Sequence, residues 1–308
     1  MSIVEVKGLK KQFADKKVID DISFTVEENR VFGFLGRNGS GKTTTMKMLL
    51  GLLQPDEGNL NICGELVRFG ETKTNKYVGF LPDVPMFYPF MTAREYLLLC
   101  GEITGLKQPY TKQKSEELLD LIGLANESGR IGTYSRGMKQ RLGIAQALLN
   151  EPKLLICDEP TSALDPIGRK QILDILHEVK QKTTVIFSTH VLSDVERICD
   201  DIAVLHEGKI VMEGDLQAIK RQYQSDQSDL LHIQFGTEDD KNKFCGLSSI
   251  QNLLNDSNFK EEKMSLQFKH THFTEQLVLQ AFQEAHVFPQ KLEKMEQSLE
   301  NIFMDVVK

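Results

Sequence analysis

The chain has 308 residues, of which 40% are hydrophobic and 26% are charged, and its formal net charge is −7. This composition is typical of a soluble globular protein with one large domain, or with one large and one small domain. The negative charge argues against a nucleic-acid binder that works through bulk positive charge, although it leaves a local basic patch open.

The chain is predicted to begin with strands. Apolar residues at 3, 4 and 6 and at 22, 24 and 26 indicate two of them, and residues 30–35 indicate an apolar strand that ends at a glycine-rich loop. A helix is expected at 43–53, because the segment Gln-Pro-Asp-Glu-Gly that follows it favours a turn.

From about residue 86 to 150 the sequence becomes helical, with helices predicted at 97–103, 114–122 and 138–149. Strands return at 154–157 and 184–188, and a helix is expected between them at 167–180. This alternation predicts a parallel, buried sheet that is interrupted by a helical insert.

Beyond about residue 220 the pattern changes again. The polar residues 222–229 are expected to form a linker, strands are expected at 230–235 and 264–268, and a helix is expected at 273–284. Apolar residues in the tail, at 299, 302, 303 and 306, have helical spacing. We therefore predict a large domain at 1–220, with a helical subdomain at about 86–150, and a small α+β domain at 221–308.

The five cysteines are scattered and odd in number, which favours reduced thiols over a disulfide framework or a metal site. His270 and His272 would share one strand face, but a metal role for this pair is not favoured. The N-terminus lacks a signal-peptide pattern, and no run approaches the roughly 20 apolar residues that cross a bilayer. If the protein serves a membrane process, we expect another chain to supply the membrane part.

Residues 36–43 fit the phosphate-binding pattern G-x-x-x-x-G-K-[ST] without a mismatch, between a predicted strand and a predicted helix. Glycines let the backbone turn and aim its N–H groups inward, and the helix N-terminus adds to this anion cradle. Lys42 supplies a positive charge for the β- and γ-phosphates, and the Thr43 hydroxyl can ligate Mg²⁺. The alternative is a glycine turn that merely joins strand to helix, but such a turn does not require Lys followed by Thr.

We therefore predict ATP and Mg²⁺ as cofactors. The predicted cradle residues are Gly36, Arg37, Asn38, Gly39, Ser40, Gly41, Lys42, Thr43 and Thr44. Asp158 and Glu159 follow an apolar strand, where the first can hold Mg²⁺ through water and the second can orient the attacking water or accept its proton. Alone, these two carboxylates would equally suit an acidic turn. The phosphate loop upstream favours the catalytic interpretation.

Further segments follow in a fixed order and spacing: Tyr-Ser-Arg-Gly-Met at 134–138, Ser-Ala-Leu-Asp at 162–165, and His190 after an apolar strand. With the phosphate loop and the carboxylate pair, they make residues 1 to about 220 resemble the ATP-binding subunit of ABC transporters. The resemblance implies a P-loop NTPase cassette of the α/β class. Such a cassette has a mainly parallel core sheet, an N-terminal antiparallel β part and a helical insert, here with the small C-terminal domain appended.

The same resemblance implies roles that the residues alone do not show. Phe13 matches the aromatic that stacks on adenine, although a lone phenylalanine is more often a core or strand-edge residue. Ser135 and the Gly137 backbone match the signature that contacts the γ-phosphate held by a second subunit, so that two chains share two ATP molecules head to tail. His190 matches the residue that senses the γ-phosphate, and Glu159 matches the catalytic carboxylate.

Three positions depart from the family pattern. Arg136 replaces the first signature glycine and adds bulk and charge beside a phosphate site, where it either strengthens ATP contact or hinders closure. Met138 replaces the usual glutamine. Asp83 stands where many members carry glutamine. We expect it at the hinge to the helical insert, where it would be a further residue that contacts ATP and Mg²⁺.

Within the family the chain resembles bacterial ABC-2 exporters of drugs, peptide antibiotics and bacteriocins. This implies an ATPase whose homodimer closes on ATP and drives a separate integral membrane permease, from the cytoplasmic face of the cell membrane. Aromatic residues and methionines at 85–91 indicate either insert core or a patch that docks the permease. The alternatives are a soluble ABC-type ATPase with a nucleic-acid role, which usually has tandem cassettes or a basic linker, and a non-transport ATP-binding regulator.

Overall fold

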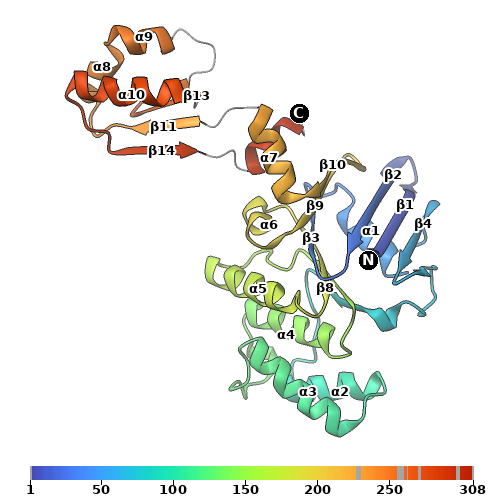
Figure 1. Cartoon of the computed structure of the whole chain (residues 1–308). Coiled ribbons are helices and arrows are strands. Elements are labelled where there is room, and N and C mark those ends of the chain that lie inside the picture. The colour runs from blue at the N-terminus through green and yellow to red at the C-terminus, as the bar shows by residue number, and fades with distance from the viewer. Residues whose placement is uncertain are drawn as a thin grey trace. The chain divides into compact units, whose positions relative to one another are not determined.

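A computed structural model describes residues 2–226, 230–254, 260–261, 263–269, 272–295 and 299–306 (Figure 1). Contacts within the chain divide these residues into two compact units, one that ends at Leu216 and one that spans Gln217–Val306. Each unit is described by itself. The predicted domain division at residue 220 lies close to this boundary and stays a prediction.

The first unit begins with an antiparallel sheet of strand order β2-β1-β4-β5. Its strands are β1 (Ser2–Phe13), β2 (Lys16–Glu27), β4 (Glu57–Ile62) and β5 (Glu65–Leu66). In β2 the apolar side chains at Ile22, Phe24 and Val26 are buried while the residues between them are exposed, which is the alternation that the sequence predicted. The predicted N-terminal antiparallel part is confirmed.

The second sheet of this unit has the strand order β10-β9-β3-β8-β7-β6. Its strands are β3 (Val31–Leu35), β6 (Val78–Leu81), β7 (Leu154–Asp158), β8 (Thr184–Thr189), β9 (Asp201–His206) and β10 (Lys209–Asp215). All neighbours are parallel except the edge pair β9 and β10. Every residue of β3, β7 and β8 is buried, as expected for strands with both faces covered.

Helices lie between the strands of the first unit. They are α1 (Lys42–Leu49), α2 (Ala93–Ile103), α3 (Gln108–Leu121), α4 (Arg136–Leu148), α5 (Pro166–Val179) and α6 (Leu192–Ile198). Between β6 and β7, which pair in the sheet, the chain forms α2, α3 and α4, and this is the predicted helical insert.

Helix α1 is shorter than the predicted 43–53. Gly51 adopts φ +66°, its N–H donates to the Met48 carbonyl, and the Leu52 N–H donates to the Lys47 carbonyl. This pair of bonds is the Schellman arrangement, in which a left-handed glycine ends a helix. The apolar spacing continued past Leu49, but the glycine decided where the helix stops.

The core of the first unit joins both sheets and α1. Phe24 of β2 stacks on Phe32 of β3 with ring centroids 5.6 Å apart, and it also contacts Phe34 at 5.5 Å. Met46 and Leu49 of α1 are buried in the same cluster. The end of β3, where the glycine loop begins, therefore rests on the antiparallel sheet.

The second unit has an antiparallel sheet of order β12-β13-β11-β14, and three of its helices, α8, α9 and α10, share a hydrophobic core with that sheet. Its strands are β11 (Leu230–Gln234), β12 (Lys260–Glu261), β13 (Ser265–Lys269) and β14 (Lys291–Met295). Its helices are α7 (Leu216–Asp226), which begins at the boundary, α8 (Glu238–Cys245), α9 (Ser248–Leu254), α10 (His272–Ala285) and α11 (Leu299–Val306). The predicted α+β character and the predicted helical tail are confirmed.

Two predictions for this unit are wrong. Residues 222–226 were expected in a linker, but they belong to α7, and none of them is a glycine or proline that would break a helix. Residues 227–229 and His270 lie outside the described residues. His272 begins α10, so the prediction that it lies on a strand face is wrong. Of the helices that the structure describes, none has the length and apolar character needed to cross a membrane.

The packing of α4 on β6 leaves no room for a side chain at Gly79. A Cβ atom there would overlap the carbonyl oxygen of Ala147 in α4. We predict that Gly79→Ala lowers the free energy of unfolding by about 1–3 kcal/mol, because backbone must shift to admit the methyl group. Urea unfolding followed by circular dichroism measures this change.

The matched control is Gly236→Ala, since a Cβ atom at Gly236 meets nothing within 4 Å and its φ is not positive. It should change the free energy of unfolding by less than about 0.5 kcal/mol. Equal stability of the Gly79→Ala protein and the parent would contradict the close packing of α4 on β6.

Candidate functional site

The phosphate loop lies between the end of β3 and the start of α1. Gly41 caps α1 with φ +114° and ψ 2°, a conformation that L side chains rarely adopt. A Cβ atom on Gly41 would also lie 2.5 Å from Ile19 Cδ1 of β2. The first turn of α1 carries no acidic residue and no side-chain cap. Its N–H groups therefore remain available to an anion.

Lys42 is the charged centre of the loop. Its side chain is only 5% exposed. Its ammonium donates to the Gly36 carbonyl at 2.7 Å and to the Arg37 carbonyl at 3.3 Å, and it lies 3.2 Å from Glu159 Oε1. Because a buried ammonium needs oxygen partners, these contacts hold the lysine inside the loop.

The carboxylate pair stands at the end of β7. Asp158 is buried, and its Oδ1 accepts a hydrogen bond of 2.6 Å from the Ser188 hydroxyl of β8. The same hydroxyl oxygen accepts a 3.0 Å bond from the Glu159 main-chain N–H. One serine therefore fixes both carboxylate residues, and sequence reasoning did not select it. A polar residue within the buried strand, beside a predicted carboxylate, was the available signal.

Glu159 links the loop to the end of β8. It has φ +49°, which is uncommon for a residue with a Cβ atom and is typical of functional sites. One carboxylate oxygen faces Lys42, and the other lies 2.9 Å from His190 Nδ1. Because a carboxylate only accepts, Nδ1 carries the proton in this contact. The structure therefore joins Lys42, Glu159 and His190, three residues that are far apart in sequence.

The residues of the loop fit a triphosphate. Beside the uncapped helix end and the lysine, Ser40 Oγ is buried and has no hydrogen-bond partner among the described residues. A polar atom left unpaired in an anion cradle points to a missing acceptor or donor. For Mg²⁺, Thr43 is an exposed residue of the loop, and the buried Asp158 supplies a hard oxygen donor at the end of β7, which β8 separates from β3.

Phe13 ends β1, on the hairpin whose second strand contacts the phosphate loop through Ile19. Its ring is 46% exposed, and the Lys11 ammonium lies 5.4 Å from the ring centroid. Lys11 in turn pairs with Asp56 at 2.6 Å, and this contact lowers the pKa of the Asp56 carboxyl. The phenylalanine is therefore an exposed, braced aromatic and not a core residue.

The signature residues line a separate hollow of about 370 Å³. Ser135 caps α4 by accepting the Met138 N–H at 3.2 Å, and Asp165 caps α5 by accepting the Gly168 N–H at 3.0 Å. The hollow lies between these two helix starts, and Arg136 and Gly137 also line it. Two helix N-termini beside one hollow favour negative charge there.

Asp83 lies two residues beyond the end of β6, where α4 holds it. Its carboxylate is 3.4 Å from an Arg136 guanidinium nitrogen, and its carbonyl accepts a 2.5 Å bond from the fully buried Gln140. Two of the positions that depart from the family pattern thus contact each other. Gln140 was not selected from the sequence, because a glutamine at helical spacing has no distinctive signal.

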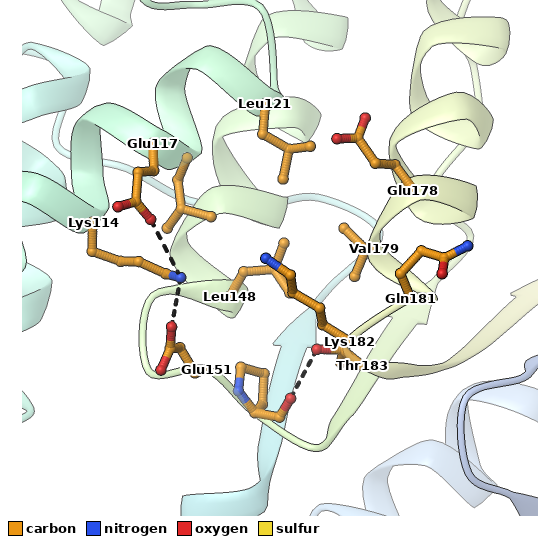
Figure 2. A pocket seen from close by; sticks show the side chains of 12 residues that line it. Lys114, Glu117, Leu121, Leu148, Glu151, Glu178, Val179, Gln181, Lys182 and Thr183 are labelled. Carbon is orange, nitrogen blue, oxygen red and sulfur yellow. Dashed lines mark hydrogen bonds and ion pairs between the residues drawn. The ribbon is translucent and has the colours of Figure 1, made fainter.

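Another hollow, of about 750 Å³, lies where β7 and β8 begin (Figure 2). Since β3, β7 and β8 are parallel, this is the edge of the sheet opposite to the phosphate loop. Lys114 there is already paired with Glu151 at 2.7 Å and Glu117 at 3.7 Å. Lys114 is occupied by these carboxylates and no glycine loop lines the hollow, so it does not resemble a phosphate site.

Three features define the class of a phosphate-loop nucleotide-binding protein: a glycine loop between a strand and a helix, a buried lysine, and a carboxylate pair at the end of a parallel strand of the same sheet. The family model described as ABC transporter matches residues 19–162. The ABC transporter ATP-binding protein YxlF of Bacillus subtilis (strain 168) is 44% identical over 224 residues, which are 72% of this chain and 74% of that protein.

Two further comparisons agree with this one. The bacitracin transport ATP-binding protein BcrA of Bacillus licheniformis is 40% identical over 223 residues, 71% of this chain and 72% of that protein. A solved ATP-binding subunit of an ABC transporter superposes with a TM-score of 0.64 at 33% identity, over 72% of this chain and 93% of that one. The chain belongs to the ABC transporter ATP-binding family. It binds ATP and is an ATPase subunit that powers a membrane transporter, and the predicted cassette fold is confirmed.

The double role of the Ser188 hydroxyl gives a test of the site. We predict that Ser188→Ala lowers the free energy of unfolding by about 1–3 kcal/mol, because the buried Asp158 carboxylate loses a donor and the Glu159 N–H loses an acceptor. Thermal unfolding measures the change. Ser23→Ala is the control, since Ser23 Oγ accepts an exposed main-chain bond from Gly8. It should have an effect of less than about 0.5 kcal/mol. Similar losses in both variants would contradict the assignment.

Proposed function

We propose that Glu159 is the catalytic carboxylate of this ATPase, and that it orients the attacking water and accepts its proton. The observation that carries the proposal is the position of its carboxylate, 3.2 Å from Lys42 and 2.9 Å from His190. Lys42 and the N–H groups of the loop would hold the phosphates. His190 would orient Glu159 and sense the terminal phosphate, since its ring is 44% exposed and can reach a ligand.

We also propose Mg²⁺ as the metal, held by Thr43 and, through water, by Asp158, with Asp83 as a further oxygen donor at this edge. When bound, the ion would neutralise the charge that develops on the phosphates. Phe13 would stack on adenine. Support comes from the exposed, braced ring of Phe13 and from the position of Asp158 at the strand end beside the loop.

Glu159→Gln tests the proposed function. The amide cannot accept a proton but keeps the size of the side chain, so kcat for ATP hydrolysis should fall by about 10²–10⁴-fold while ATP still binds. Phosphate release and ATP-dependent dimer formation, measured by light scattering, report the two properties separately. Glu178→Gln, on the exposed end of α5, is the control and should leave the rate unchanged. A Glu159→Gln protein with the parent's turnover would overturn the proposal.

For the assembly we propose a homodimer in which the signature of each chain closes over ATP held by its partner. The support is the hollow between the starts of α4 and α5, lined by Ser135 and Gly137, which favours an anion but is distinct from the phosphate loop. Within one chain the signature and the loop form separate sites. A head-to-tail pair would place them together.

The remaining surface proposal concerns the membrane partner. Four exposed apolar residues follow β6 and form what we call the docking patch: Val84, Met86, Tyr88 and Phe90, which are 59%, 83%, 52% and 64% exposed. Phe87 turns the other way and packs on Tyr96 with ring centroids 5.0 Å apart, while the Tyr96 hydroxyl lies 3.0 Å from Gln146 Oε1. An exposed patch on a fixed base favours protein contact.

We propose that this patch docks a cytoplasmic segment of an integral membrane permease, which would place the chain at the cytoplasmic face of the cell membrane. For the direction of transport we propose export. The support is the resemblance to ABC-2 exporters, together with the relative that is named for bacitracin transport.

We predict that negative charge in the docking patch weakens the contact between this chain and the permease. For the double variant Met86→Glu/Phe90→Glu, co-purification of the membrane chain from a detergent extract should fall by at least about tenfold, because a carboxylate cannot enter an apolar contact without desolvation. The ATPase rate of the isolated subunit should stay within about twofold. Leu52→Glu, at a residue 62% exposed after α1, is the control. Full co-purification of the double variant would exclude the patch.

A further inference from the structure

The ion pair between Asp83 and Arg136 connects two parts of the chain. Under the proposed function, one part acts on the chain's own ATP and the other on ATP held by the partner. Asp83 follows β6, and the pairing of Leu81 with Cys157 places the end of β6 beside the end of β7, where Glu159 lies. Arg136 is the first residue of α4 and lines the signature hollow. The pair therefore connects the ends of β6 and β7, where the chain's own ATP would be hydrolysed, with the signature.

The supports of this pair are rigid. The buried Gln140 holds the Asp83 carbonyl at 2.5 Å, one turn along α4 from Arg136. Helix α4 packs on β6 so closely that Gly79 has no room for a methyl group. Helix α4 thus fixes the main chain of both Asp83 and Arg136. Only their charged side chains can change partners.

The pair itself is weak. The Asp83 and Arg136 side chains are 47% and 45% exposed, and the distance of 3.4 Å is long for a charge-assisted hydrogen bond. An exposed ion pair shifts an equilibrium by about fivefold or less. Phosphate oxygens in the hollow would attract Arg136 more strongly than one exposed carboxylate does.

We propose that the Asp83–Arg136 pair is a latch that keeps the guanidinium of the signature arginine on Asp83 until the partner's ATP arrives. This rests on the proposed function. In the latched chain, Arg136 is bound to Asp83. In the closed dimer, the guanidinium of Arg136 leaves Asp83 and contacts the partner's phosphate in the hollow, and Asp83 is released toward the strand ends of its own site. Arg136 then favours closure of the dimer, and Asp83 opposes closure by binding Arg136.

The test uses the full chain carrying Glu159→Gln and measures the ATP concentration for half-maximal dimer formation by light scattering. Adding Asp83→Asn should lower this concentration by about two- to fivefold, because Arg136 is no longer held. Adding Arg136→Gln should raise it by about tenfold or more, because the phosphate loses a charged donor. With Arg136→Gln already present, Asp83→Asn should no longer lower this concentration.

The control is Asp174→Asn, since Asp174 and Arg197 form an equally exposed pair, at 2.8 Å, between α5 and α6. It should leave the ATP concentration unchanged. If Asp83→Asn raises the ATP requirement, or has the same effect with and without Arg136, the latch is wrong and Asp83 acts only within its own site.

A second measurement needs no dimer. Phenylglyoxal modifies arginines that are not shielded, and mass spectrometry follows Arg136 and Arg197 in the same nucleotide-free sample. Asp83→Asn should increase the rate at Arg136 at least about twofold and leave the rate at Arg197 unchanged. An unchanged rate at Arg136 would overturn the latch. If the Glu159→Gln parent forms no dimer with ATP, the proposed dimer fails, and the Arg136 rates still decide on the latch.

Discussion

A buried ammonium is unfavourable unless oxygen atoms surround it, and much of the first unit is arranged around this requirement of Lys42. Two carbonyls of its own loop accept from it, and the Glu159 carboxylate supplies the opposite charge. That carboxylate reaches the loop because β3 and β7 are parallel and share β8 as a neighbour, so that their ends meet at one edge of the sheet. Without the lysine, Glu159 would keep only the contact of its other carboxylate oxygen with His190.

The same edge explains why Glu159 adopts a left-handed backbone conformation. Strand β7 ends so that Asp158 stays buried against Ser188, while the next residue, Glu159, turns its carboxylate toward Lys42 and His190. A conformation of this kind costs about 1–3 kcal/mol and persists only where surrounding contacts fix it. Ser188 provides such a contact by accepting the Glu159 N–H. The strained backbone of Glu159, the position of its carboxylate and the buried Ser188 therefore depend on one another.

Much of the fold followed from patterns that are local in the chain. The fully apolar strands predicted a parallel sheet with both faces covered, and the long helical stretch before residue 150 predicted the insert. The end of α1 and the start of the second unit were less well predicted. In α1 a glycine at 51 outweighed continued apolar spacing, and in α7 polar residues continued a helix where a linker was expected. Both errors concern element ends, where a single backbone conformation decides.

The phosphate loop, the carboxylate pair and the signature could be identified from residue order alone, because each is a short continuous segment whose residue types indicate its chemistry. Which of these segments touch depends on the fold. Ser188 lies 30 residues from Asp158, Gln140 lies 57 residues from Asp83, and Arg136 lies 53 residues from Asp83. The sequence noted Arg136 and Asp83 as separate departures. Their contact depends on how closely α4 packs on β6, and that distance is set by the whole core and not by any local pattern.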